Sequence, residues 1–129
     1  MKKKVRVFLS FEFGRDNELH RNFYSQAKCH SKYKIVDCSL NEQYHPDALW
    51  LNKARKQIAL SDIVIVVLGQ DTHNAPGVKK EVTVAGQLDK PMFQIRSKHS
   101  TGGKVAGAGD VIRWKWKRID AKIAECLSG

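Results

Sequence analysis

The fold is decided by residues 61–96, SDIVIVVLGQDTHNAPGVKKEVTVAGQLDKPMFQIR. Residues 63–68 form an unbroken aliphatic run, which is typical of a strand buried on both faces of a parallel sheet. After a polar loop, Pro76 suits the first turn of a helix, and Pro91 ends that helix before another apolar run. The stretch therefore predicts strand, loop, helix and strand, which together form a βαβ unit.

Glu81 occupies an unusual position on the predicted helix. At about 3.6 residues per turn, it falls within the apolar face, while Lys79, Lys80 and Thr83 lie opposite. A carboxylate on that face loses water and needs a hydrogen-bond partner, a backbone donor of the first turn or a ligand. Alternatively, it is an acid that favours the helix N-terminus and bends outward to solvent. The sequence leaves both interpretations open.

The remaining periodic segments extend this unit in both directions. Asp16 or Asn17 begins a helix that ends near Lys28, and Asp47 and Asp110 are expected to cap two further helices. The expected elements are strands at 5–10, 33–38 and 92–95 and helices at 17–28, 48–60 and 111–127. Alternating strands and helices with right-handed crossovers predict an α/β, flavodoxin-like three-layer sandwich with about four to five parallel strands, and residues 1–129 are expected to form one domain.

Two segments have more than one interpretation. Trp50 lies one residue off the buried stripe of its helix, so it either covers the edge of the core, which we favour, or lines a site. Residues 97–109, SKHSTGGKVAGAG, lack the spacing of a Walker loop or a dinucleotide fingerprint. We therefore expect a flexible lid or connector there.

Composition excludes several classes of protein. No apolar run reaches the roughly 18 residues of a membrane span. The three cysteines, Cys29, Cys38 and Cys126, are an odd number without close pairing, which favours reduced thiols in the cytoplasm. The five histidines lack the spacing of metal ligands, so we expect no metal.

The formal net charge of +10 predicts attraction to anions such as nucleotides and phosphates. The basic residues are spread along the chain, and no zinc-finger, RNP-type or basic-zipper pattern is present, so nucleic acid is not the expected partner. In an open parallel sheet, ligands bind beyond the carboxyl ends of the strands. That edge collects residues 10–16, 39–46 and 70–74 with Glu81, which predicts one site.

Several of these segments resemble the TIR-like domains of prokaryotic defence proteins, in particular the small TIR-like subunit of Thoeris antiphage systems. The most specific segments are residues 63–81 and the corner DCSL at 37–40. The resemblance also covers VFLSFEFGRDNELHRNFY (7–24), IVDCSL (35–40), ARKQIALSDIVIVVLGQDTHNAPGVKKEVTVAGQLDKPMFQI (54–95) and VIRWKWKRIDAKIAE (111–125).

The resemblance implies an enzyme that uses NAD as substrate and needs no further cofactor. Such members cleave the nicotinamide glycosidic bond and make a cyclic ADP-ribose isomer or a related ADP-ribose signal, after phage infection, to activate an effector protein. The family's catalytic glutamate aligns with Glu81. The resemblance further implies substrate contacts from the loop after the first strand and from the facing loop, by Ser10, Phe11, Arg15, Asp16 and Ser39. Phe11 either stacks on a ring or belongs to the core, and Arg15 pairs with Asp16 or with a phosphate.

Two other functions compete with this interpretation. Many TIR domains carry a tryptophan three residues before the glutamate, where this chain has Val78, so the wall beside the nicotinamide is expected to be built differently. Many TIR domains also act by self-association, a role that the basic last helix would suit. A non-catalytic TIR-like module that binds a nucleotide signal or a protein is therefore the first alternative. A receiver-type phosphoacceptor is disfavoured, because the chain offers only Glu12 and a displaced Asp71 for its acidic site.

Overall fold

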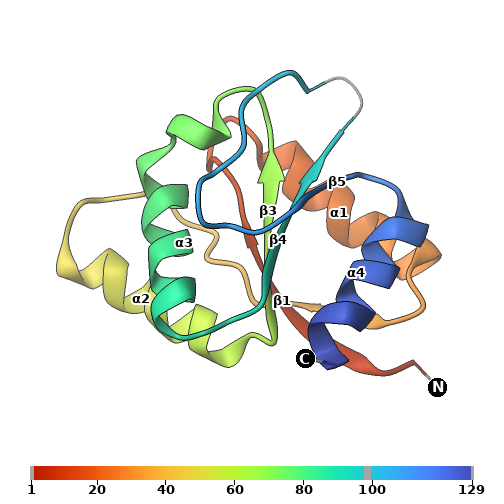
Figure 1. Ribbon diagram of the computed structural model, residues 1–129. Coiled ribbons are helices and arrows are strands. Elements are labelled where there is room, and N and C mark those ends of the chain that lie inside the picture. The colour runs from red at the N-terminus through yellow and green to blue at the C-terminus, as the bar shows by residue number, and fades with distance from the viewer. Residues whose placement is uncertain (1, 98–99, 129) are drawn as a thin grey trace.

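Five parallel strands form a single sheet in the computed structural model, which describes residues 2–97 and 100–128 (Figure 1). The strand order is β2-β1-β3-β4-β5, the order of flavodoxin-like folds. The strands are β1 (Lys4–Ser10), β2 (Lys34–Asp37), β3 (Ile63–Leu68), β4 (Met92–Arg96) and β5 (Val111–Arg113). The predicted α/β sandwich is confirmed.

The helices cover both faces of the sheet. Figure 1 shows α2 and α3 on one side and α1 and α4 on the other. Their bounds are α1 (Asn17–His30), α2 (Ala48–Leu60), α3 (Pro76–Gln87) and α4 (Trp116–Ser128), with a 3₁₀ turn η1 (Thr72–Asn74) before α3. None of these helices is long and apolar enough to cross a membrane, within the residues that the structure describes.

The central strand β3 joins the two halves of the core, and all six of its residues are buried. Ile65 packs in the cluster that contains Phe23 of α1 and Ile119 of α4, whereas its neighbour Val64 packs with Ile58 of α2. Alternate residues of a strand point to opposite faces, so a wholly aliphatic run is what a sheet covered on both sides requires. Each such side chain contributes about 2 kcal/mol of hydrophobic free energy.

The prediction was most accurate in the middle of the chain. Strand 63–68 and helix 48–60 are confirmed to the residue. Asp47 caps α2 as expected, because its carboxylate accepts a hydrogen bond from the backbone nitrogen of Trp50 at 2.8 Å. The unbroken aliphatic run of β3 and the capped, periodic sequence of α2 give these two elements a strong signal within the local sequence.

The region after Gly109 was predicted wrongly. Asp110 does not cap a helix; residues 111–113 form the edge strand β5, and α4 begins at Trp116. The Gln94 backbone nitrogen donates to the Asp110 carbonyl at 2.8 Å, and the Trp114 nitrogen donates to the Arg96 carbonyl at 3.0 Å. Pairing with β4 therefore overrides the helical periodicity of the local sequence.

The glycine-rich connector is packed rather than open. The buried side chain of Gln94 accepts from the Val105 nitrogen at 2.8 Å and donates to the carbonyls of Val105 and Gly109 at 3.0 and 2.8 Å. Val105 and Ala108 are buried among apolar residues of β3 and α3. Of the two structures expected for this segment, these contacts support a connector and not a flexible lid over residues 100–109. Lys98 and His99 lie outside the described residues.

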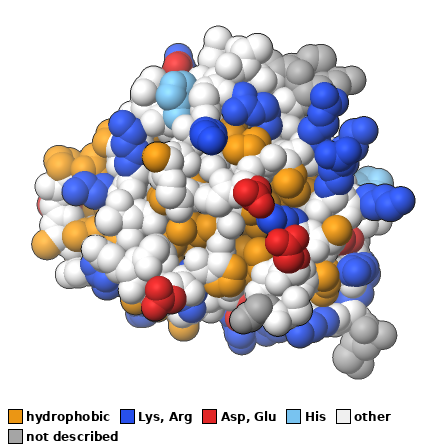
Figure 2. Space-filling model, viewed as in Figure 1, with side chains coloured by type: hydrophobic (Ala, Val, Ile, Leu, Met, Phe, Trp, Pro, Cys, Tyr) orange, Lys and Arg blue, Asp and Glu red, His pale blue; other side chains and the backbone are white. Residues whose placement is uncertain are grey.

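The positive charge is dispersed over the face of the molecule that Figure 2 shows. Figure 2 shows Lys and Arg side chains around the rim of the face viewed, with apolar side chains between them. This distribution agrees with the absence of a single basic arm in the sequence.

Asp120 ties α4 to the turn between α1 and β2. Its carboxylate is buried and accepts from the Ser31 hydroxyl at 2.6 Å and from the Lys32 backbone nitrogen at 2.9 Å. Asp120→Ala is expected to lower the free energy of unfolding by about 2–3 kcal/mol, because it leaves buried donors without an acceptor. Urea denaturation of the variant and the wild type measures this difference.

Asp110→Ala is the matched control for that measurement. Asp110 also pairs with a side chain, that of Lys122, but its own side chain is 79% exposed. Removing an exposed ion pair is expected to change stability by less than about 0.5 kcal/mol. Equal losses in the two variants would contradict the structural role assigned to Asp120.

Candidate active site

The side chain of Glu81 is buried against the end of β1. It is 6% exposed, and its Oε1 accepts a hydrogen bond from the Ser10 hydroxyl at 2.7 Å. Burial raises the pKa of the carboxyl to about 8, although the Ser10 hydrogen bond acts in the opposite direction. The alternative in which Glu81 bends outward to solvent is therefore excluded, and its partner is a side chain 71 residues earlier.

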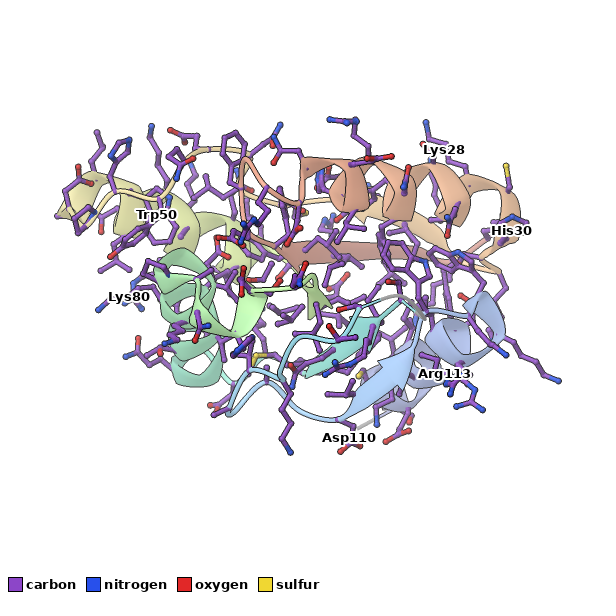
Figure 3. The ribbon with its side chains drawn as sticks, turned by 90° about the horizontal axis from the view of Figure 1, so that it is seen from above. Lys28, His30, Trp50, Lys80, Asp110 and Arg113 are labelled. Atoms are coloured by element: carbon purple, nitrogen blue, oxygen red, sulfur yellow. The ribbon has the colours of Figure 1, made fainter. Side chains whose placement is uncertain are left out.

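A cavity of about 100 Å³ lies beside this carboxyl. Aromatic side chains form much of its wall, and Figure 3 shows Trp50 on the side of α2 that faces α3. The lining residues are Leu9, Phe11, Glu12, Phe13, Leu40, Glu42, Gln43, Tyr44, Trp50, Ala75, Pro76, Gly77, Val78 and Glu81. Trp50 is only 4% exposed, so it covers the edge of the core and lines the cavity at once.

Phe11 is fixed in the cavity wall by a stack of side chains behind it. Its ring lies 4.7 Å from that of His20 at an angle of 19°, and His20 Nε2 is 3.0 Å from the carboxylate of Asp37. Burial acts to raise the pKa of Asp37, but hydrogen bonds from His20 and Ser39 outweigh burial and leave the pKa below its ordinary value. Phe11 thus belongs to the core and also lines the cavity, while stacking on a ligand ring stays a prediction.

Ser39 supports the end of β1 rather than the cavity wall. Its hydroxyl oxygen accepts from the Leu9 backbone nitrogen at 3.0 Å and lies 3.1 Å from the Tyr24 hydroxyl. Leu9 lines the cavity and precedes Ser10. Ser39 therefore acts on the site through the backbone that carries Ser10.

Arg15 and Asp16 line a neighbouring hollow of about 400 Å³. Arg15 pairs with Asp71 and not with Asp16, and Asp16 is the acceptor for the Thr72 hydroxyl at 3.2 Å. A contact between Arg15 and a phosphate stays a prediction. Burial raises the pKa of Asp16, against the effect of the Thr72 hydrogen bond. The structure thus brings together Ser10, Phe11 and Glu81, and it places Arg15 and Asp16 in a separate hollow, because both residues follow the turn that leaves the β1 edge.

Tyr44 and Glu12 line the cavity but were not among the predicted site residues. The Tyr44 ring packs edge-on against Trp50 with centroids 4.8 Å apart, and Tyr44 Cβ would lie 3.0 Å from a Cβ built on Gly77. Glu12 was considered only as part of a receiver site. Burial is the largest cause of the raised pKa of Glu12, and the charges of Asp16 and Asp71 raise this pKa further, while Arg15 lowers it. A signal was available in the sequence, since both residues fall in loops expected at the carboxyl edge.

The described residues contain no group of three His, Cys, Asp or Glu side chains that could hold a metal ion. The cavity wall itself carries carboxyl groups and aromatic rings.

Comparison with known proteins places the chain in a family. A family model described as "Thoeris protein ThsB, TIR-like domain" matches residues 8–101, from the middle of β1 to beyond β4. No curated protein matches the chain. The matched range includes Glu81 and the residues around the cavity, and it spans more than half of the chain. The protein therefore belongs to the TIR-like domain family of the Thoeris protein ThsB, a family of antiphage defence.

Proposed function

We propose that the protein is a signalling enzyme that cleaves the nicotinamide glycosidic bond of NAD, with Glu81 as its catalytic residue. The observation that carries the proposal is the buried Glu81 carboxyl, held by Ser10 within an aromatic-walled cavity at the carboxyl edge of the sheet. A buried acid in a cleft, with a strongly raised pKa, is a frequent mark of a functional site. Membership of the Thoeris TIR-like family supports NAD as the substrate.

The reaction suits a site with a single essential carboxyl group. Nicotinamide in NAD is already a cationic leaving group, so its departure needs no general acid, unlike the leaving group of ordinary glycosides. The positive charge that develops on the ribose needs a nearby anion and groups that hold the ribose hydroxyls. Ionised Glu81 supplies that charge, and Ser10 holds its Oε1 in place.

Protonation of Glu81 couples substrate binding to catalysis. With a pKa of about 8, the carboxyl is largely protonated in the free protein at neutral pH. The cationic nicotinamide ribosyl group favours the ionised form, because an opposite charge nearby lowers the pKa of an acid. NAD binding at neutral pH is therefore accompanied by loss of a proton from Glu81.

The identity of the product depends on the group that attacks the ribose. If water is kept out of the cavity, a hydroxyl of the same molecule attacks and forms a cyclic ADP-ribose isomer; another acceptor forms a related ADP-ribose conjugate. The product then diffuses to an effector protein in the cytoplasm. Phage infection is the expected trigger, and self-association is a further route to the active form.

Mass spectrometry of small molecules from cells tests the proposal. Cells that express the wild type or Glu81→Gln are compared with and without phage infection, and purified protein is assayed for nicotinamide release. A new ADP-ribose species that requires both Glu81 and infection is the expected result. Unchanged NAD and no new nucleotide in infected wild-type cells would overturn it.

A non-catalytic module that binds a nucleotide signal or a protein partner is the second candidate. Val78 lines the cavity at the position where many TIR domains carry a tryptophan, so the cavity wall departs from that of those domains, which favours this candidate. Binding of ADP-ribose compounds without turnover, equal in the wild type and Glu81→Gln, is the outcome that distinguishes this candidate.

Ser10→Ala is expected to shift the pH dependence of NAD cleavage. The acid limb of kcat/KM reports the pKa of the free enzyme, so the wild type should gain activity as the pH rises through about 8. Loss of the Ser10 hydrogen bond removes a contact that favours ionised Glu81, so the limb should move roughly 0.5–1 pH unit higher. Rates measured across the pH range check this shift, and an unchanged limb would contradict the coupling between the two residues.

A further inference from the structure

Two buried polar atoms beside Glu81 have no hydrogen-bond partner. Within the described residues, three buried side-chain atoms lack one: Glu12 Oε1, Trp50 Nε1 and His73 Nδ1. The first two belong to residues that line the Glu81 cavity, whereas His73 lies outside it. Buried polar atoms are nearly always paired, so two unpaired atoms on residues that line one cavity point to a ligand that supplies both partners.

The chemistry of the two atoms specifies that ligand group. The indole nitrogen of Trp50 only donates, and the carboxylate oxygen of Glu12 only accepts. The matching group must carry an acceptor and a donor, as a primary carboxamide does with its oxygen and its NH₂. The rings of Phe11 and Tyr44 in the same wall add flat apolar surfaces that suit an aromatic ring. Together these residues fit an aromatic carboxamide.

We propose that Trp50 and Glu12 select the leaving group of the substrate through its carboxamide, with Trp50 Nε1 donating to the oxygen and Glu12 Oε1 accepting from the NH₂. The inference rests on the proposed function, since nicotinamide is the carboxamide that NAD carries. The cavity is about 100 Å³, so binding of the ring requires its wall to open, and the loop at 41–46, which holds Tyr44, is a part of that wall that belongs to no helix or strand.

The proposal predicts discrimination against a closely related dinucleotide. Nicotinic acid adenine dinucleotide has a carboxylate in place of the carboxamide, which places a negative charge against Glu12 and removes the donor. A site that leaves its own polar groups unpaired rejects the wrong substrate strongly, so kcat/KM for NAD should exceed that for the nicotinic acid analogue by roughly 100-fold or more.

Two variants separate the two contacts. Glu12→Gln replaces the carboxylate with an amide that can donate to a carboxylate. The ratio of kcat/KM for NAD to kcat/KM for the nicotinic acid analogue should therefore fall to roughly tenfold or less, because kcat/KM for the analogue rises. Trp50→Phe keeps an aromatic ring but lacks the N–H, so KM for both dinucleotides should rise roughly tenfold with their ratio unchanged. Circular dichroism confirms that each variant is folded.

Glu42→Gln is the matched control, because Glu42 lines the same cavity but pairs with Lys53 at 3.1 Å and is 46% exposed at its side chain. Glu42→Gln should keep the wild-type ratio of kcat/KM for NAD to kcat/KM for the nicotinic acid analogue, because it alters neither contact to the carboxamide. Binding of free nicotinamide and free nicotinic acid, followed by NMR titration, measures the same selection without turnover. Equal preference for NAD in the wild type, Glu12→Gln and Glu42→Gln would overturn this inference and leave the proposed function standing. Selective nicotinamide binding that requires Glu12, in a protein that cleaves no NAD under infection conditions, would overturn the proposed function and leave the carboxamide contact standing.

Discussion

Glu81→Gln is expected to end NAD cleavage and at the same time to raise the free energy of unfolding by about 3 kcal/mol at pH 7. The loss of activity should be roughly 1,000-fold or more, because glutamine cannot supply the negative charge that stabilises the reacting ribose. The gain in stability arises because the wild-type carboxyl is buried beside a single hydrogen-bond donor, the Ser10 hydroxyl. At pH 7 the carboxyl must take up a proton when the protein folds, whereas glutamine is neutral in both states and can accept the same hydrogen bond.

The size of the stability gain depends on pH in a definite direction. The carboxyl has an ordinary pKa of 4.5 in the unfolded chain and a pKa of about 8 in the folded protein. Between these values the folded protein binds a proton that the unfolded chain has lost, so wild-type stability falls as the pH rises from 4.5 to about 8. The contribution of Glu81 is fully retained below pH 4.5 and fully lost above about pH 8.

Thermal unfolding at several pH values checks this expectation. The wild type and Glu81→Gln should have similar melting temperatures near the acid end of the range and diverge by roughly 10 °C at neutral pH. Glu42→Gln serves as the control, because Glu42 is exposed and its replacement should leave no such divergence. Parallel curves for the wild type and Glu81→Gln would show that Glu81 is ionised in the folded state.

Gly109→Ala is expected to destabilise the protein by roughly 3–4 kcal/mol. Gly109 has a φ of +81°, where an alanine is strained, and a Cβ built on it would lie 2.3 Å from the backbone carbonyl oxygen of Met92. The Gly109 backbone cannot move freely, since its carbonyl accepts from Gln94 and the next residue pairs with β4. Met92 is likewise fixed, because it pairs with Val64 of β3. The substitution should therefore loosen the edge strand β5.

Gly107→Ala separates the two causes of that loss. Gly107 has nearly the same φ of +82°, but a Cβ built on it would meet no atom within 4 Å. Its replacement should cost only about 1–2 kcal/mol, from backbone strain alone. Chemical denaturation of both variants measures the difference, and hydrogen exchange at β5 locates it. Equal losses would mean that the close approach to Met92 is relieved by a small shift.

The elements that the sequence predicted best are those whose signal is local. The aliphatic run of β3 and the capped, periodic helix α2 carry their own determinants within a few residues. Glu81 was identified for the same reason, since its place within the apolar face of α3 follows from helical periodicity. The strand β5 was missed because its three residues become a strand only by pairing with β4.

The candidate site was predicted in outline and not in detail. Parallel topology places the β1 end near α3, which is why Ser10, Phe11 and Glu81 were expected together. The sequence did not show which partner each polar side chain contacts: Arg15 pairs with Asp71, and Ser39 accepts a hydrogen bond from the backbone of β1. Such choices depend on distances between loops that the local sequence does not contain.

The sequence by itself therefore determined the order of most elements, the two-sided core and the presence of an acid within an apolar helix face. Only the tertiary structure decided that Ser10 meets Glu81 across 71 residues and that Glu12 and Trp50 contribute unpaired polar atoms to the wall of the same cavity. The physical reason is that periodicity and capping act over a few residues, whereas hydrogen bonding and burial at the site depend on which distant segments the folded sheet brings together.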